Sequence, residues 1–139
     1  MVPTELEDYK GVKSLITTGG GRSLDEYIIH QSEMIVTVLG TGAKSVVCEM
    51  KDEVAVLNVS YDDGRSAVMN YAPKLGFTVE SEGKKTAITS PYFKNLISDI
   101  IRFANGGEKS FCGCQTIEAI KVRAAAVEAY NNPGKIINI

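Results

Sequence analysis

The amino-acid sequence predicts an α+β fold, in which helices pack on one face of a predominantly antiparallel β-sheet of about five to six strands. Short segments with apolar residues at every second position occupy residues 46–89, and tight-turn sequences separate them. One segment with helical periodicity precedes these strands, and two more follow them. A chain of 139 residues is long enough for one domain with its own hydrophobic core.

The N-terminal part is predicted to contain one strand and one helix. Residues 1–10 are polar and are expected to be a frayed linker segment, so that the folded domain spans residues 11–139. Residues 11–18, GVKSLITT, have the composition of a strand. Gly19-Gly20-Gly21 ends this strand, and we expect a turn that needs positive φ rather than a surface for substrate or nicotinamide.

A helix follows the glycine run. Ser23 or Asp25 is its expected N-cap, and Gly40-Thr41-Gly42 ends it, because glycine readily forms a left-handed C-cap. The chain then changes to a period of two. Alternating apolar positions predict strands at 46–50, 55–61, 67–71, 77–80 and 86–89. Turns at Asp62-Asp63-Gly64 and Ser81-Glu82-Gly83-Lys84 predict hairpins, and the five strands together predict an antiparallel meander.

Two helices are predicted to cover this sheet. Ser90-Pro91 is a typical helix start, and Asn105-Gly106-Gly107 ends that helix. The last helix runs from about Thr116 to Tyr130 and ends at Asn131-Asn132-Pro133-Gly134, before a short extended tail. The predicted core stripes of the two helices are Phe93, Leu96, Ile97, Ile100 and Phe103, and then Ile117, Ile120, Ala124 and Val127.

Composition excludes several classes of function. The net charge of −2 gives no basic surface for nucleic acid, and no apolar run approaches the length of a membrane span. The acidic N-terminus does not resemble a signal peptide. Cys48, Cys112 and Cys114 form a poor disulfide framework and lack the spacing of a zinc site. We therefore expect a cytoplasmic protein without a structural metal.

Candidate chemistry is concentrated on the first helix, which carries the sole histidine, His30. Glu26 and Glu33 lie four residues before and three residues after it, on the same helix face. Imidazole titrates near neutral pH, and a flanking carboxylate selects its tautomer and stabilises its protonated form. The residues alone also allow a solvated helix face, where the pair contributes only a few tenths of a kcal/mol.

In this order, the motifs resemble those of the C-terminal domain of the Gfo/Idh/MocA oxidoreductases. Glu26-Tyr27-Ile28-Ile29-His30, followed by Glu33, resembles the family's acid-three-residues-histidine motif, with glutamate where the family usually has aspartate. Tyr61-Asp62-Asp63-Gly64-Arg65 resembles its hairpin, and residues 100–107 with 115–119 resemble its closing helix–loop–helix. The resemblance covers about residues 12–130.

The resemblance implies a site and a cofactor. It implies that His30 moves a proton at the substrate hydroxyl that becomes a carbonyl, and that Glu26 accepts a hydrogen bond from His30 or from that hydroxyl. Arg22, Tyr27 and Glu33 are the expected substrate-binding residues, whereas Arg65 and Arg123 are expected to be surface charges. NAD or NADP is implied as the cofactor, bound mainly by an N-terminal dinucleotide-binding domain whose glycine fingerprint this sequence lacks.

Two functions are compatible with these motifs. The first is the substrate-binding and oligomerisation domain of an NAD(P)-dependent sugar or polyol oxidoreductase, not expected to be active alone. The second is a free-standing, non-catalytic binding or assembly module of the same fold. In either case we expect a homo-oligomer formed through the open sheet face, which would carry Val47, Val54, Val56, Ser66 and Val68. A cysteine nucleophile is disfavoured, because the only histidine is distant in sequence.

Overall fold

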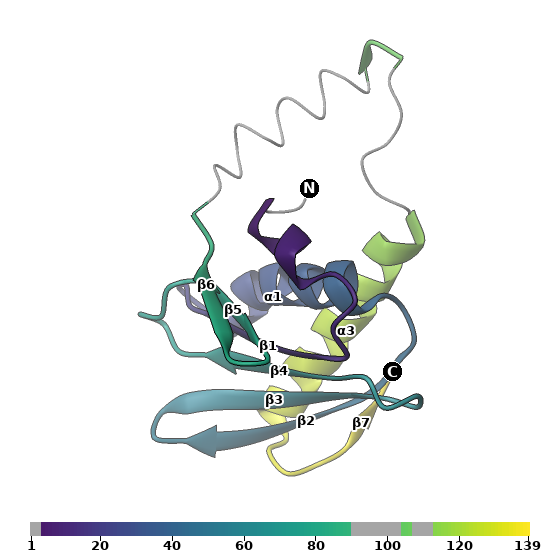
Figure 1. The fold of residues 1–139 in the computed structure, drawn as a ribbon. Coiled ribbons are helices and arrows are strands. Elements are labelled where there is room, and N and C mark those ends of the chain that lie inside the picture. The colour runs from purple at the N-terminus through teal and green to yellow at the C-terminus, as the bar shows by residue number, and fades with distance from the viewer. Residues whose placement is uncertain (1–3, 90–103, 107–112) are drawn as a thin grey trace.

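The computed structural model describes residues 4–89, 104–106 and 113–139. The predicted helix that begins at Ser90-Pro91 lies almost entirely outside these residues. In chain order the described elements are η1 (Thr4–Tyr9, a 3₁₀ helix), β1 (Ser14–Gly19), α1 (Leu24–Leu39), β2 (Ala43–Lys51), β3 (Val54–Tyr61), β4 (Ser66–Tyr71), β5 (Thr78–Ser81), β6 (Lys84–Ala87), α3 (Gly113–Asn131) and β7 (Ile137–Asn138). This α+β architecture confirms the predicted fold class (Figure 1).

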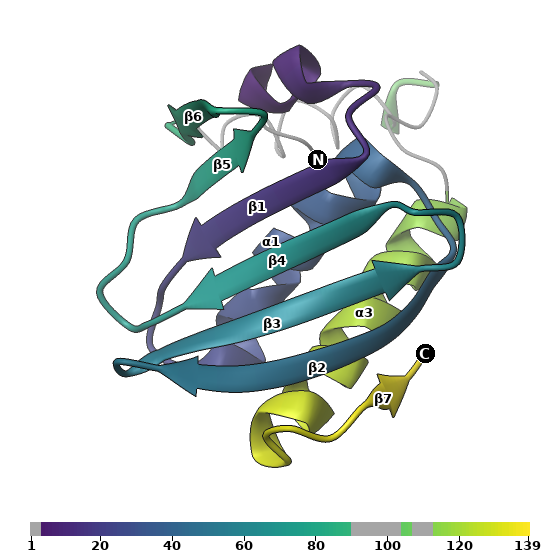
Figure 2. The same ribbon diagram turned by 60° about the horizontal axis from the view of Figure 1, so that its bottom comes forward.

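The described strands form one seven-stranded sheet in the order β6-β5-β1-β4-β3-β2-β7 (Figure 2). The predicted hairpins β2–β3, β3–β4 and β5–β6 are all antiparallel. The prediction of a continuous five-stranded meander is wrong between β4 and β5, because β1 lies between these two strands. β1 runs parallel to β4 and antiparallel to β5. Residues 72–77 join β4 to β5, and a connection of this length can cross one strand at a spacing of about 4.8 Å. The sheet is therefore mixed.

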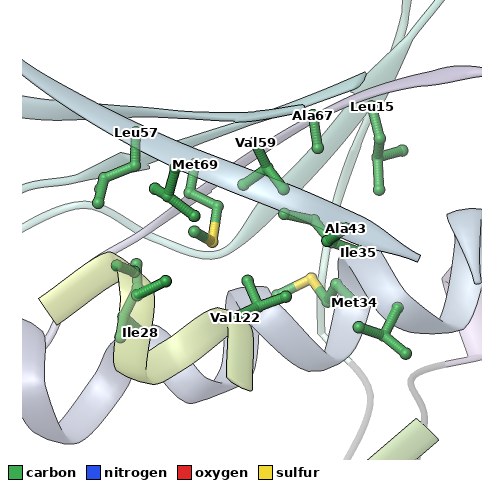
Figure 3. Close-up of a cluster of buried hydrophobic side chains, with 14 of the residues drawn as sticks. Leu15, Ile28, Met34, Ile35, Ala43, Leu57, Val59, Ala67, Met69 and Val122 are labelled. Carbon is green, nitrogen blue, oxygen red and sulfur yellow. The ribbon is translucent and has the colours of Figure 1, made fainter. Parts of the chain in front are cut away.

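Helices α1 and α3 lie side by side on one face of the sheet, as Figure 2 shows. The opposite face is not covered by any described helix. Side chains from the covered face meet those of the two helices in a single core (Figure 3). Among the residues drawn there are Leu15, Ile28, Met34, Ile35, Ala43, Leu57, Val59, Ala67, Met69 and Val122. Burial of this apolar surface is the main force that holds α1 against the sheet.

The buried stripe of α3 differs from the predicted one. Ile117 and Ile120 are 57% and 54% exposed, and Ala124 is exposed as well. The buried positions are instead Ala119, Val122, Ala125, Ala126 and Ala129. Both stripes fit a period of 3.6 residues, but the small alanine side chains let α3 approach α1 and the sheet closely. The predicted core position of Ile117 and Ile120 is wrong, because the helix turns its alanine-rich stripe toward the core instead.

The N-terminal segment is folded, not frayed, from Thr4 onward. Leu6 and Tyr9 are almost fully buried, and the Tyr9 hydroxyl lies 2.7 Å from Thr86 Oγ1. That hydroxyl also donates to the carbonyl oxygen of Val79, 70 positions along the chain. Two apolar residues three positions apart thus anchor η1, although acidic neighbours give the segment a polar average. The expected fraying of residues 1–10 is wrong for residues 4–9.

The cysteines also differ from expectation. Cys48 is a free, buried thiol on β2. Cys114, in the first turn of α3, is disulfide-bonded. The prediction that the cysteines form a poor disulfide framework is therefore wrong at Cys114. Because this cysteine is disulfide-bonded, the cysteines do not indicate a reducing compartment. Among the described helices, none is long and apolar enough to cross a membrane.

Candidate functional site

The candidate site lies on α1, and hydrogen bonds at both ends define this helix. Ser23 has extended backbone angles, and its Oγ accepts a hydrogen bond from the Glu26 amide, which confirms Ser23 as the N-cap. At the other end Gly40 has φ of +84°, and its amide donates to the Val36 carbonyl at 2.8 Å. The glycine end predicted from sequence is confirmed.

Two arginines attach the ends of α1 to the rest of the domain. Arg123 of α3 donates to the Asp25 carbonyl at 2.7 Å, and Arg65 donates to the Leu39 carbonyl. Arg65 is itself held by Asp63, at 2.8 Å, and by stacking over the Tyr61 ring. The sequence predicts surface charges rather than ligands at both positions, and each arginine also donates a hydrogen bond to a backbone carbonyl of the helix that carries His30. The Asp-Gly-Arg hairpin motif thus has a structural role here.

The glycine run is packed against its own chain. A Cβ atom on Gly19 would lie 2.5 Å from the Phe77 ring, and one on Gly20 would lie 2.5 Å from the Ala72 carbonyl oxygen. Gly21 has φ of +136°, and a Cβ there would lie 2.2 Å from the Tyr27 ring. Positive φ therefore explains Gly21, whereas Gly19 and Gly20 are required by the close approach of residues 72–77.

His30 is half-buried between two aromatic rings. The Phe77 ring lies edge-on to the imidazole, with centroids 5.8 Å apart, and the Tyr27 ring lies 6.0 Å away. Burial lowers the pKa of His30 below its ordinary value of 6.5, because desolvation disfavours the imidazolium. The imidazole is thus predominantly neutral at pH 7 and can accept a proton. This direction is opposite to the predicted stabilisation of the protonated form.

Of the two carboxylates predicted to flank the imidazole, Glu33 is the one with an ion-pair distance to it. Glu33 Oε2 lies 4.0 Å from His30 Nδ1. Burial raises the pKa of Glu33 above its ordinary value of 4.5. Glu26 Oε2 instead accepts a hydrogen bond from Arg22 Nη2 at 2.5 Å. The predicted residues therefore form two sets: His30 with Glu33 and Tyr27 on α1, and Glu26 of α1 with Arg22, which precedes the helix.

A separate cleft of about 370 Å³ lies at the N-terminal end of α1. The residues that line it come from the start of α1 and the two residues before it, from the β2–β3 hairpin, from the end of β4 and the loop after it, and from the end of α3: Arg22, Ser23, Leu24, Asp25, Met50, Glu53, Ala55, Tyr71, Pro73 and Tyr130. Of the predicted site residues, only Arg22 lines this cleft. The Tyr71 hydroxyl donates to the Gly21 carbonyl at 2.9 Å, so Tyr71 connects the cleft to the glycine run.

The sequence patterns do not reveal Phe77 as a neighbour of His30. The two residues come from different elements, and the pattern around Phe77 indicates only a strand. The sequence offers one signal for this contact: Gly76-Phe77 ends a proline-containing loop, and this loop is too long for a hairpin turn. Within the described part of the chain, no three His, Cys, Asp or Glu side chains gather as metal ligands.

No known family model and no curated protein matches the sequence. Solved structures do match the fold. A protein provisionally described as a myo-inositol dehydrogenase, from Sinorhizobium meliloti, matches 97% of this chain with a TM-score of 0.68 and 15% identity. An oxidoreductase from Agrobacterium radiobacter, in complex with NAD⁺, L-tartaric acid and magnesium, matches 98% with a TM-score of 0.65 and 15% identity. An aldose-aldose oxidoreductase from Caulobacter crescentus, complexed with glycerol, matches 96% with a TM-score of 0.60 and 12% identity.

These matches define the class of fold. The chain spans 59%, 62% and 57% of the lengths of those three structures, respectively. The described architecture is therefore that of one part of Gfo/Idh/MocA-type dehydrogenases, consistent with their C-terminal domain. At such low identity the likeness shows the fold alone.

Proposed function

We propose that this chain is the substrate-binding and oligomerisation domain of an NAD(P)-dependent oxidoreductase that acts on sugars or polyols. The observation that carries the proposal is a neutral, half-buried histidine on the helix after β1, in a fold shared with dehydrogenases over 97% of the chain. The relative in complex with L-tartaric acid and the one complexed with glycerol both hold small polyhydroxylated molecules, which supports this substrate class.

The chemistry that His30 supplies is proton transfer. Oxidation of a secondary alcohol to a ketone removes the hydroxyl proton and a hydride. A neutral imidazole accepts that hydroxyl proton and becomes imidazolium. In this proposal Tyr27, beside the imidazole, hydrogen-bonds a neighbouring hydroxyl group of the substrate, and Arg22 with Glu26 offers a polar pair nearer the N-terminal end of the helix. These contacts fit a substrate with several hydroxyl groups.

The described residues do not fit the pyrophosphate of NAD or NADP. A pyrophosphate loop needs glycines whose missing side chains leave room for the phosphates. Here Phe77, Ala72 and Tyr27 fill the space beside Gly19, Gly20 and Gly21. The glycine run therefore binds its own chain, and under this proposal the cofactor is held by a dinucleotide-binding domain outside the described residues.

The first experiment is to measure the mass of the natural gene product in cell extract with an antibody to this domain. The proposal expects roughly 100–150 additional residues, enough for another domain. In that complete enzyme, His30→Ala should reduce kcat by about 10²–10⁴-fold with the fold intact. Near-normal turnover of the variant would remove His30 from the mechanism. A band at 15.0 kDa would contradict the attached domain.

The second candidate function is a free-standing assembly module, and the open sheet face supports it as it supports the oligomerisation role in the first candidate. On that face Val47, Val54, Val56 and Val68 are partly exposed, and Ile16 is 36% exposed. A partly apolar face of this kind is seldom left in water. Both candidates predict a symmetric oligomer by light scattering at micromolar concentration, whereas a monomer would contradict both. Only the first predicts dehydrogenase activity in the complete gene product.

A further inference from the structure

Two carboxylates on α1 are near His30 by sequence spacing, and the structure distinguishes them. We propose that Glu33, rather than Glu26, is the residue that positions the imidazole of His30, by occupying the side of its Nδ1 atom. Its role in a reaction rests on the proposed function of His30 as a base, whereas the pairing itself can be measured independently. Glu33 is thus a positioning residue, because it acts through His30.

Glu26 is already engaged with another charged group. Its Oε2 lies 2.5 Å from Arg22 Nη2, and the side chains of Arg22 and Glu26 are 78% and 49% exposed. A guanidinium is a stronger partner for a carboxylate than a neutral imidazole, because it carries a positive charge and its fork of N–H donors matches the carboxylate oxygens. Glu26 therefore belongs to the first turn of α1 and its Arg22 partner.

Glu33 has the geometry of a histidine partner. Its Oε2 lies 4.0 Å from His30 Nδ1, an ion-pair distance that is longer than a hydrogen bond. Such contacts are often long in a protein without substrate and shorten in the substrate complex. Both side chains are about two-fifths exposed, so solvent screens this pair less than it screens Arg22 and Glu26.

Among the described residues, the other elements packed against α1 bring few competing charges. β1 and β4 carry no charged residue, and residue 77, whose ring meets the imidazole, is phenylalanine. The charged residues of η1 and α3 are Glu5, Glu7, Asp8, Glu118, Lys121, Arg123 and Glu128. Four of them are engaged elsewhere: Glu5 with Thr89, Asp8 with Lys84, Glu118 with the β2 amides and Arg123 with the Asp25 carbonyl. Glu7, Lys121 and Glu128 are exposed.

The pairing has a chemical consequence for the neutral imidazole. A carboxylate beside Nδ1 favours the tautomer with its proton on Nδ1, because that N–H faces a negative charge. The lone pair that accepts a proton is then on Nε2. The edge-on Phe77 ring restricts rotation of the imidazole, which helps to keep Nδ1 on the Glu33 side. Glu33 thus determines which nitrogen acts as the base.

The test uses the fact that the chain has one histidine, so its NMR signals need no assignment. The ¹⁵N and ¹H shifts of the His30 ring are followed from about pH 4 to 9 in the wild type, Glu33→Gln and Glu26→Gln. Loss of the Glu33 charge should lower the pKa of His30 by about 0.5 and move the tautomer population from Nδ1–H toward Nε2–H. Glu26→Gln, the matched control on the same helix face, should change that pKa by less than about 0.2.

A larger change in Glu26→Gln than in Glu33→Gln, or no change of pKa and tautomer in Glu33→Gln, would overturn the proposal. Amide spectra check that the variants are folded, and Glu33→Asp provides a second variant that keeps the charge but retracts it by one methylene. In Glu33→Asp the pKa of His30 should lie between its values in the wild type and in Glu33→Gln. Failure of the proposed function is visible in a separate experiment, as normal turnover of His30→Ala in the complete enzyme. That outcome would leave the titration results for the wild type and the Glu33 variants as they are.

Discussion

Glu118 is predicted to be one of the most important polar residues for stability. It is a carboxylate on α3 that is only 9% exposed. Its Oε1 accepts hydrogen bonds from the amides of Gly42 and Ala43, both at 2.9 Å. These amides begin β2 directly after the end of α1, so one side chain joins α3, the α1–β2 connection and the sheet. Replacement by alanine removes the acceptor of both hydrogen bonds at once.

The size of the effect depends on the fate of the two amides in Glu118→Ala. Ala43 is buried, and leaving its N–H without an acceptor costs about 2 kcal/mol. Gly42 is exposed, so its amide can bind water, and its loss costs about 1 kcal/mol. The expected total is about 3 kcal/mol, a large fraction of the roughly 5–15 kcal/mol that is typical of a domain. Glu118→Gln keeps a neutral oxygen acceptor and should cost about 1 kcal/mol.

Urea denaturation followed by circular dichroism measures this effect. With a slope of about 2 kcal/mol per molar urea, Glu118→Ala should lower the midpoint by about 1.5 M. Glu128→Ala, an exposed position on the same helix, is the control and should change stability by less than about 0.5 kcal/mol. A loss below about 1 kcal/mol for Glu118→Ala, or equal losses for the alanine and glutamine variants, would show that the two amides do not depend on this carboxylate.

Three further predictions concern a turn, pH and α3. Asp52 and Glu53 both have positive φ, so replacing the pair with Asn-Gly should stabilise the β2–β3 hairpin by about 1 kcal/mol in urea melts. Because burial lowers the pKa of His30, the unfolded chain binds its proton first as pH falls below 6.5. Wild type should therefore lose more stability than His30→Gln between about pH 7 and 5, and equal losses would count against this. On α3, Ala126→Leu should lower the free energy of unfolding by about 1–3 kcal/mol, because it overpacks a buried position, whereas Ile120→Ser should change it by less than about 0.5 kcal/mol. A larger loss for Ile120→Ser than for Ala126→Leu would contradict the buried face of α3 described above.

Much of the local structure follows from short stretches of sequence. The alternation of apolar residues predicts β2, β3 and β4, and the Asp62-Asp63-Gly64 turn predicts the β3–β4 hairpin. Ser23 and Gly40 mark the two ends of α1. These features depend on interactions between residues only a few positions apart, so their signal is local. The motifs in their order also indicate the class of fold that the solved structures share.

The site could be predicted only in part. The spacing of Glu26, His30 and Glu33 places them on one helix face, but it does not show which carboxylate meets the imidazole. That choice depends on Arg22, which pairs with Glu26, and on side-chain geometry. The lowered pKa of His30 likewise depends on burial beside Phe77, which the topology of the sheet brings to α1.

The strands from β2 to β4, the hairpin turn between β3 and β4, and the helix that carries the histidine can thus be predicted without coordinates. The position of β1 between β4 and β5, the buried face of α3 and the role of Glu118 are properties of the folded chain. The β1–β4 pairing and the Glu118 hydrogen bonds join residues about 50 to 75 positions apart. The periodicity of the sequence is the same whichever face of α3 is buried, and it does not indicate which strands lie beside β1. Packing of the whole chain selects the buried face and the neighbouring strands.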